Sequence, residues 1–163
     1  MSAAQPDFHI LPAHSSEAHL SVVRSLFTAY TTWLDLDLTF QNYAAELAAL
    51  PGAYAPPSGA LLVAVDTESS MPLGVIAMRS LKSQTGDVVV GGARSCELKR
   101  LYTVPEARGR GVARALVREA LGIARDAGYH IALLDTLKKM EAARGLYASE
   151  GVCGNGEILR YAA

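Results

Sequence analysis

The side chains best suited to bind or transfer a charged group are concentrated in one part of this sequence. Arg94–Arg125 contains eight basic and three acidic residues, a net charge of +5, whereas residues 1–93 contain three basic and eight acidic residues, a net charge of −5. The first segment is therefore expected to attract anions, and the part of the chain before it to attract cations.

An arginine- and glycine-rich turn lies at the centre of the basic segment, made of Arg108, Gly109, Arg110, Gly111 and Arg114. If a helix begins here, its first N–H groups are unpaired and carry the positive end of the helix dipole, which is suited to bind phosphate. Helices favour acidic residues in the first turn, so these arginines cost stability unless an anion lies among them. The alternative is a solvated basic surface.

Other phosphate-binding patterns do not fit this turn. The chain contains no Gly-x-x-x-x-Gly-Lys-Ser/Thr sequence, and Arg114 occupies a position where the dinucleotide-binding pattern needs glycine or alanine.

The apolar pattern places the turn between a strand and a helix. Alternation predicts a strand over Arg94–Val104, which Pro105 ends, with Cys96, Leu98, Arg100 and Tyr102 on one face. A helix is predicted from Gly109 to about Ala127, because apolar residues recur at helical spacing and Gly128 follows in the usual C-terminal position.

The remaining elements complete an α/β pattern. Strands are predicted at His9–Leu11, Gly59–Asp66, Leu73–Leu81, Tyr129–Asp135 and Ile158–Tyr161. Helices are predicted after Ser15 or Ser16, at Asn42–Leu50 and at Lys138–Glu150. Val88–Gly92 fits either a strand or a loop, and the Pro/Gly-rich segment 51–59 reads as a loop. Antiparallel strands would come first, with a strand–helix–strand crossover in the middle.

Length and composition limit the classes of protein to consider. With 163 residues, half of them hydrophobic, the chain is expected to form a single domain over residues 1–163. A net charge of −1 and a pI of about 6.4 argue against a general nucleic-acid partner. No apolar stretch approaches the roughly 20 residues that span a bilayer, and no secretory signal is present, so we expect a soluble, cytoplasmic protein without a membrane partner.

Metal binding and disulfide chemistry are not expected. Two cysteines, Cys96 and Cys153, cannot build a disulfide framework and suit a reducing compartment. The four histidines have no ligand spacing with the cysteines, so we predict no metal site.

Val104-Pro105 followed by Arg108-x-x-Gly111-x-Ala113 resembles the Arg/Gln-x-x-Gly-x-Gly/Ala signature of the GNAT superfamily of N-acetyltransferases. The context is similar as well, with a strand before, a helix after, and Ala143-x-x-Leu146-Tyr147 leading to Gly151. The resemblance implies a GNAT-like α/β fold, in which a central, mixed, mostly antiparallel and splayed sheet is flanked by helices. The C-terminal hairpin would be shortened, and acyl-coenzyme A would lie in a V-shaped opening of the sheet.

The resemblance also implies which residues bind the cofactor. The pantetheine arm would pair with the backbone of Leu101, Tyr102 and Thr103, like an added strand. The diphosphate would lie on the turn and helix start formed by Arg108, Gly109, Arg110, Gly111, Val112, Ala113 and Arg114. Small residues let the backbone approach the diphosphate closely, and the arginines add positive charge.

Two side chains are candidates for proton transfer. Glu97 lies eleven residues before Arg108, the spacing at which histone-type members of the superfamily place a catalytic glutamate, and it could deprotonate an ammonium group. The alternative is that Glu97 only pairs with Lys99 or Arg79. Tyr147 matches the tyrosine that protonates the departing thiolate in many members; the alternative is a helix tyrosine that lines the cofactor cleft.

The resulting expectation is an acetyl-CoA-dependent N-acetyltransferase. The acetyl group would pass by direct attack of a primary amine on the thioester, with a small-molecule amine, a lysine or an N-terminal amine as acceptor. A second subunit could complete the acceptor side, as a homodimer. Met140, where many members carry asparagine, and the short C-terminal segment favour an alternative, a non-catalytic acyl-CoA-binding module. A third hypothesis is a GNAT fold recruited to other small-molecule chemistry.

Two further expectations concern the acceptor side. Asp35, Asp37 and Glu46 could attract a cationic amine, although exposed acidic residues are common on any helix surface. Tyr30 and Trp33, at the end of the first helix, are expected in the core.

Overall fold

The computed structural model describes residues 5–34, 43–83, 86–87, 89–90, 93–135, 152–153 and 158–162. Its strands are β1 (Phe8–Pro12), β2 (Ala60–Asp66), β3 (Pro72–Ser80), β4 (Lys82–Ser83), β5 (Gly86–Asp87), β6 (Val89–Val90), β7 (Ala93–Thr103), β8 (Ile131–Asp135), β9 (Val152–Cys153) and β10 (Ile158–Ala162). Its helices are α1 (Glu17–Leu34), α2 (Tyr43–Ala49) and α3 (Val112–Asp126), with short 3₁₀ turns η2 (Gly52–Tyr54) and η3 (Pro105–Ala107). The predicted helix Lys138–Glu150 lies outside the described residues.

The main sheet is mixed and mostly antiparallel, as predicted. Its strand order is β1-β2-β3-β7-β8-β10-β9, and β6 pairs with β7 off this path. Among the described strands, β7 and β8 are the one parallel pair. The short strands β4 and β5 pair with each other in a separate small sheet, and β6 shows that part of Val88–Gly92 is strand.

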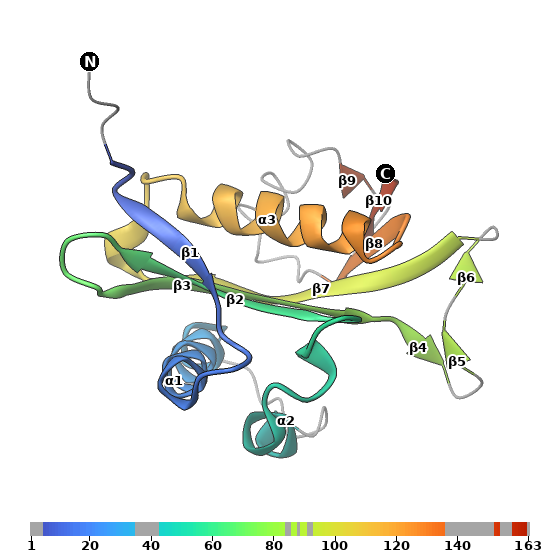
Figure 1. The fold of residues 1–163 in the computed structure, drawn as a ribbon, viewed down its shortest axis with the longest axis horizontal. Coiled ribbons are helices and arrows are strands. Elements are labelled where there is room, and N and C mark those ends of the chain that lie inside the picture. The colour runs from blue at the N-terminus through green and yellow to red at the C-terminus, as the bar shows by residue number, and fades with distance from the viewer. Residues whose placement is uncertain are drawn as a thin grey trace.

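Helices cover both faces of the sheet (Figure 1): α1 and α2 lie on one face and α3 on the other. Two apolar clusters follow from this arrangement. Ile76, Met78 and Leu98 belong to the cluster under α3, whereas Val63 and Val75 belong to the cluster that includes residues of α1. Neighbouring residues of one strand thus face opposite layers, as the two-residue period of a strand requires.

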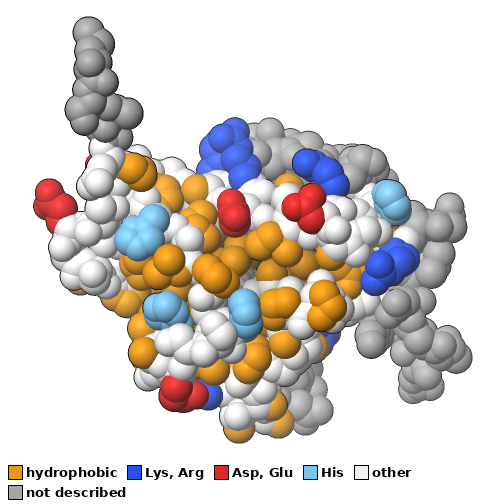
Figure 2. Space-filling view, viewed as in Figure 1, with side chains coloured by type: hydrophobic (Ala, Val, Ile, Leu, Met, Phe, Trp, Pro, Cys, Tyr) orange, Lys and Arg blue, Asp and Glu red, His pale blue; other side chains and the backbone are white. Residues whose placement is uncertain are grey.

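Helix α3 begins three residues later than the sequence pattern predicts. Gly109 and Gly111 both have φ of +78°, so the chain there is left-handed and the helix starts only at Val112. The buried stripe of the helix, which includes Leu116 and Ala120, packs on the sheet. Figure 2 shows basic side chains along the outer edge of α3, with acidic side chains beside them on the same helix.

The sheet opens between β7 and β8. The two strands pair only from Ser95 opposite Ile131 to Leu98 opposite Leu134, while β7 continues to Thr103. The splayed sheet implied by the resemblance is therefore present, and the last residues of β7 have no strand beside them on this side within the described chain.

A β-bulge changes the faces of β7, so the predicted alternation is wrong beyond Leu98. Val75 pairs with Tyr102 and Ala77 with Lys99, which leaves two residues of β7 opposite Ile76. One of them, Arg100, has φ of +60°. Because the extra residue shifts the alternation, Tyr102 packs with the α1-side cluster instead of sharing the α3 face of Leu98.

Within the described ranges, no helix is long and apolar enough to cross a bilayer.

Candidate functional site

The turn before α3 presents backbone donors toward open space. Gly111 is the N-cap of α3, and no side chain caps it. Across the described part of the chain, the N–H groups of Gly111, Val112 and Ala113 have no acceptor, as the first turn of a helix requires. A Cβ atom built on Gly109 or Gly111 would meet nothing within 4 Å. The two glycines are therefore explained by left-handed backbone, and the surface in front of the donors is accessible to an anion.

The three arginines of this turn are not equivalent. Arg110 donates from Nη2 to Oδ2 of Asp66 at 2.9 Å and to the carbonyl oxygen of Asp7 at 3.2 Å. These hydrogen bonds connect the turn to the edge of the sheet formed by β1 and β2. The Arg110 guanidinium is therefore already engaged within the protein, whereas the sequence pattern predicted that it would add charge to an anion site. Arg108 and Arg114 are exposed at either end of the turn. Among the described residues, the Arg108 side chain forms no hydrogen bond or ion pair.

The contact with Arg110 is one of several hydrogen bonds that stabilise the ionised form of Asp66. Its carboxylate accepts hydrogen bonds from the N–H groups of Ser69 and Glu68, at 2.8 and 3.0 Å, and from Arg110. The hydrogen bond from the Ser69 backbone and the Arg110 guanidinium hold the pKa of Asp66 well below its usual range. Arg110 and Asp66 therefore form a structural pair beside the turn.

The open edge of β7 leads to the same turn. Val104 donates its N–H to the carbonyl oxygen of Leu73 at 3.0 Å. Because backbone groups alternate along an antiparallel strand, those of Tyr102 also face β3 and those of Thr103 face the opening. Leu101 lies beside the bulge on the same stretch of β7. Of the three predicted pantetheine contacts, Thr103 has the clearest geometry, while Tyr102 places its ring 6.1 Å from that of Tyr30.

Glu97 lies close to the opening, one residue before the last β7–β8 pair. Its Oε2 accepts a hydrogen bond from Nε of Arg79 at 3.2 Å, and its side chain is 15% exposed. Pairing with Arg79, the alternative named above, is thus present in the structure. No donor among the described residues reaches the second carboxylate oxygen, Oε1, which can accept a proton or a hydrogen bond from a bound molecule.

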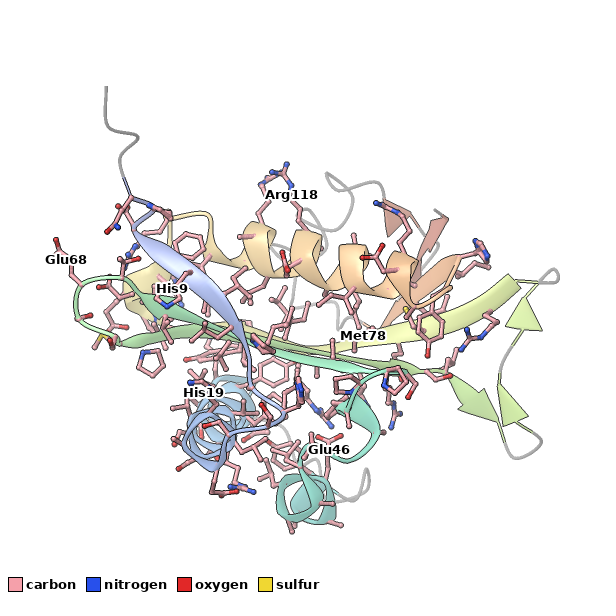
Figure 3. All side chains as sticks on the ribbon, in the orientation of Figure 1. His9, His19, Glu46, Glu68, Met78 and Arg118 are labelled. Atoms are coloured by element: carbon pink, nitrogen blue, oxygen red, sulfur yellow. The ribbon has the colours of Figure 1, made fainter. Side chains whose placement is uncertain are left out.

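A second ion pair joins β7 to α2 on the same face of the sheet. Nε of Arg100 donates to Oε2 of Glu46 at 3.1 Å, and the hydroxyl of Tyr54 donates to Oε1 of Glu46 at 2.5 Å. Figure 3 shows Glu46 between α2 and the sheet, on the side opposite Met78. The Arg100 guanidinium also lies 5.0 Å from the centre of the Tyr43 ring.

Burial and charge act together on this cluster. Burial and then the Glu46 carboxylate raise the pKa of Tyr54. Burial alone would lower the pKa of Arg100, but Glu46 offsets this, so that it is raised. Burial lowers the pKa of Lys99, which lies two residues from Glu97 on β7. Glu46, proposed to attract a cationic acceptor, is therefore already neutralised by Arg100, and Asp35 and Asp37 lie outside the described residues.

A groove of about 380 Å³ lies beside this cluster. It is lined by the C-terminal half of α2, by η2 and by Arg79, the same residue that contacts Glu97. Sequence reasoning did not identify the groove. Arg79 could have been noticed as a functional candidate, because it is a single charged residue at the end of the apolar run of β3. Nothing in the Pro/Gly-rich segment indicates that Tyr54 is a partner of Glu46.

Other predicted residues have simpler outcomes. Tyr147 and Met140 lie outside the described residues. Tyr30 is buried as expected, but Trp33 is 52% exposed and stacks on Tyr30 with ring centres 6.4 Å apart, so its assignment to the core is wrong. Cys96 is buried, which raises its pKa to about 12 and makes it a poor nucleophile. Within the described ranges, no three metal-binding side chains come together.

Comparison with known proteins connects these features to one family. The sequence profile of the Acetyltransferase (GNAT) family matches residues 20–151. An uncharacterized N-acetyltransferase of Schizosaccharomyces pombe is 38% identical over 128 residues, covering 78% of this chain and 72% of that protein. N-acetyltransferase 8F1 of Rattus norvegicus is 30% identical over 112 residues, covering 69% of this chain but 48% of that protein.

Solved structures share the fold at low sequence identity. A GNAT-family acetyltransferase from Staphylococcus aureus superposes with a TM-score of 0.73 at 12% identity, over 95% of this chain and 98% of that one. The Salmonella typhimurium protein yncA, solved with acetyl-CoA, superposes with a TM-score of 0.67 at 16% identity, over 96% of this chain and 94% of that one. A chain of the NatC complex bound to Gag peptide and CoA superposes with a TM-score of 0.71 at 19% identity, over 96% of this chain and 99% of that one.

Proposed function

Because the chain belongs to the GNAT acetyltransferase family, we propose that it transfers an acyl group, most simply acetyl, from acyl-coenzyme A to a primary amine. The observation that carries this proposal is the continuity of two features. The open edge of β7 beyond Leu98 leads, within about ten residues, to the donor-rich turn before α3. An elongated ligand with a diphosphate group fits both.

The residues present suit coenzyme A. The N–H groups of Gly111, Val112 and Ala113 would hold the diphosphate, with charge from Arg108 and Arg114. Backbone groups of Thr103 at the open edge would pair with the pantetheine amides, as an added strand does. The acetyl-CoA in yncA and the CoA in the NatC complex support this assignment by analogy of fold.

The proposed chemistry is direct attack of the amine. Bound acyl-coenzyme A supplies a thioester carbonyl as the electrophile. An ammonium group is not a nucleophile, so a base must first remove its proton, and Oε1 of Glu97 is the carboxylate oxygen that remains available for this. Tyr147, from the segment outside the described residues, would return a proton to the departing thiolate, since a phenol and a thiol are of similar acidity.

The acceptor is proposed to be a primary amine of a small molecule or of a peptide. The peptide in the NatC complex supports the second class by analogy. Within the described structure, Glu97 and the groove beside Arg79 lie on the α2 face of the sheet, opposite α3.

The test is release of coenzyme A from acetyl-CoA across a panel of amines, with product identified by mass. We expect release to depend on the amine and to fall in Tyr147→Phe while that variant still binds coenzyme A. Release at a rate independent of every amine would contradict the transferase. Binding without release would instead favour the non-catalytic acyl-CoA-binding module.

A further inference from the structure

We propose that the groove beside Arg79 binds an anionic group of the acceptor, so that the preferred acceptor carries a carboxylate close to its amine, as amino acids and their derivatives do. This inference rests on the proposed transferase function and specifies the chemical class of its substrate. It replaces the expectation of a purely cationic acceptor.

Arg79 has donor capacity that the described part of the chain does not use. Its Nε–H binds Glu97, but no acceptor among the described residues takes a hydrogen bond from its two terminal nitrogens. The side chain is 36% exposed and forms part of the groove wall. A guanidinium in this position can bind a carboxylate through both terminal nitrogens, which a lysine cannot do.

The charges around Glu97 favour an acceptor that brings its own anion. The two carboxylates near the groove already have arginine partners: Glu97 pairs with Arg79, and Glu46 pairs with Arg100. Lys99 adds a further basic group beside Glu97. An ammonium that enters here alone would be repelled by Arg79 and Lys99, whereas an amine that carries a carboxylate offsets that repulsion.

The short distance between the two side chains limits the acceptor's geometry. Glu97 and Arg79 are in direct contact at 3.2 Å, so groups bound to Oε1 and to the terminal nitrogens of Arg79 must lie near each other. An amine and a carboxylate on the same or on neighbouring carbon atoms satisfy this condition. A long diamine or polyamine does not.

The rest of the groove would hold the acceptor's side chain. Its volume of about 380 Å³ is in the usual range for small-molecule sites. Apart from Glu46, Tyr54 and Arg79, the lining consists of small or apolar residues: Ala45, Ala49, Leu50, Pro51, Gly52 and Ala53. We therefore expect uncharged side chains to be accepted and charged ones to be disfavoured.

The experiment compares acceptors that differ only in the carboxylate. With acetyl-CoA as donor, kcat/KM is measured for leucine, leucinamide and isopentylamine, and for the corresponding phenylalanine series, in the wild type and in Arg79→Met, Arg79→Lys and Arg118→Met. Arg118 lies on α3, on the other side of the sheet from Glu46 (Figure 3), and serves as a matched control. Because every ratio uses the same acceptors, differences in amine reactivity cancel between variants.

We expect the wild type to prefer the acid over the decarboxylated amine, and Arg79→Met to reduce that preference by about 10- to 100-fold, mainly through KM. The preference of Arg79→Lys for the acid should lie between those of the wild type and of Arg79→Met, and the preference of Arg118→Met should match that of the wild type. An equal loss for all acceptors in Arg79→Met would show that Arg79 acts only through Glu97, and would overturn the inference. A wild type that prefers the uncharged amines would overturn it too, while leaving the transferase intact. If no amine accelerates coenzyme A release, the transferase proposal fails and this inference fails with it.

Discussion

Arg100 and Glu46 join the bulge of β7 to helix α2 through a hydrogen bond of 3.1 Å between Nε and Oε2. Their side chains are only 6% and 18% exposed, and Arg100 has a φ of +60°, which is unfavourable for a residue with a side chain. The pair fixes Arg100 in this conformation at the point where the sheet opens. It therefore couples the helix beside the groove to the strand edge proposed to bind pantetheine.

Loss of one partner should destabilise the protein strongly. Glu46→Gln removes the carboxylate that pairs with the buried Arg100 guanidinium, and we expect the free energy of unfolding to fall by about 3 kcal/mol in urea titrations. Glu17→Gln is the matched control, because Glu17 pairs with Arg24 but is 76% exposed, and it should change stability by less than about 1 kcal/mol. The double variant Glu46→Leu, Arg100→Met should recover much of the loss. Equal effects of Glu46→Gln and Glu17→Gln would contradict a structural role for the Arg100–Glu46 pair.

The arginines of the turn should separate into binding and structural roles. Arg108→Gln removes an exposed charge without a described partner, so coenzyme A affinity should fall by about 5- to 10-fold with little change in Tm. Arg110→Gln breaks the contact with Asp66 and should lower Tm with a smaller effect on affinity. Calorimetric titration and thermal melts of both variants give the comparison. The reverse pattern would show that Arg110, and not Arg108, meets the anion.

Asp66 should contribute a pH-dependent part of the stability. Its pKa is lowered in the folded state, from an unfolded value of about 3.9, so its contribution is complete above about pH 4 and is lost as pH falls toward the folded pKa. The difference in Tm between wild type and Asp66→Asn should therefore shrink as the pH falls from about 4 to about 2. Glu68→Gln, an exposed neighbour, is the control and should differ little from wild type throughout. A constant difference for Asp66→Asn would refute the assignment.

The base role of Glu97 has a pH signature. Glu97→Gln keeps the shape of the side chain but cannot accept a proton, so turnover should fall by about 10²-fold or more near neutral pH. Activity should partly return at high pH, where the free amine forms without a base. Coenzyme A binding should be unchanged, because Glu97 lies on the α2 face and away from the turn. Loss of turnover that is the same at every pH would point to the Arg79 pair as a structural requirement only.

Local patterns in the sequence predicted most of the fold. Strands β2 and β3 and the body of helix α3 follow from apolar periodicity. The beginning of α3 was placed too early because periodicity does not report φ, and the left-handed Gly109 and Gly111 delay the helix.

The features that local patterns missed depend on contacts between distant segments. The bulge at Arg100 reverses the faces of β7, and it becomes visible only when β7 is paired with β3. The same holds for Arg110 with Asp66, for Arg100 with Glu46 and for Arg79 with Glu97, because the sequence reveals each charge but not its partner. The groove beside Arg79 likewise requires α2, η2 and β3 together.

The central claim is that acyl-coenzyme A binds with its diphosphate on the turn before α3. Calorimetric titration of acetyl-CoA into Gly111→Asp tests it most directly. Gly111→Asn controls for the left-handed φ of +78° at this position, and Gly122→Asp on α3 controls for an added charge, since a Cβ at either glycine meets no other atom within 4 Å. The added carboxylate at position 111 would face the diphosphate, so we expect binding to be lost in Gly111→Asp and retained in Gly111→Asn, in Gly122→Asp and in the wild type. Wild-type affinity in a folded Gly111→Asp protein would contradict the account.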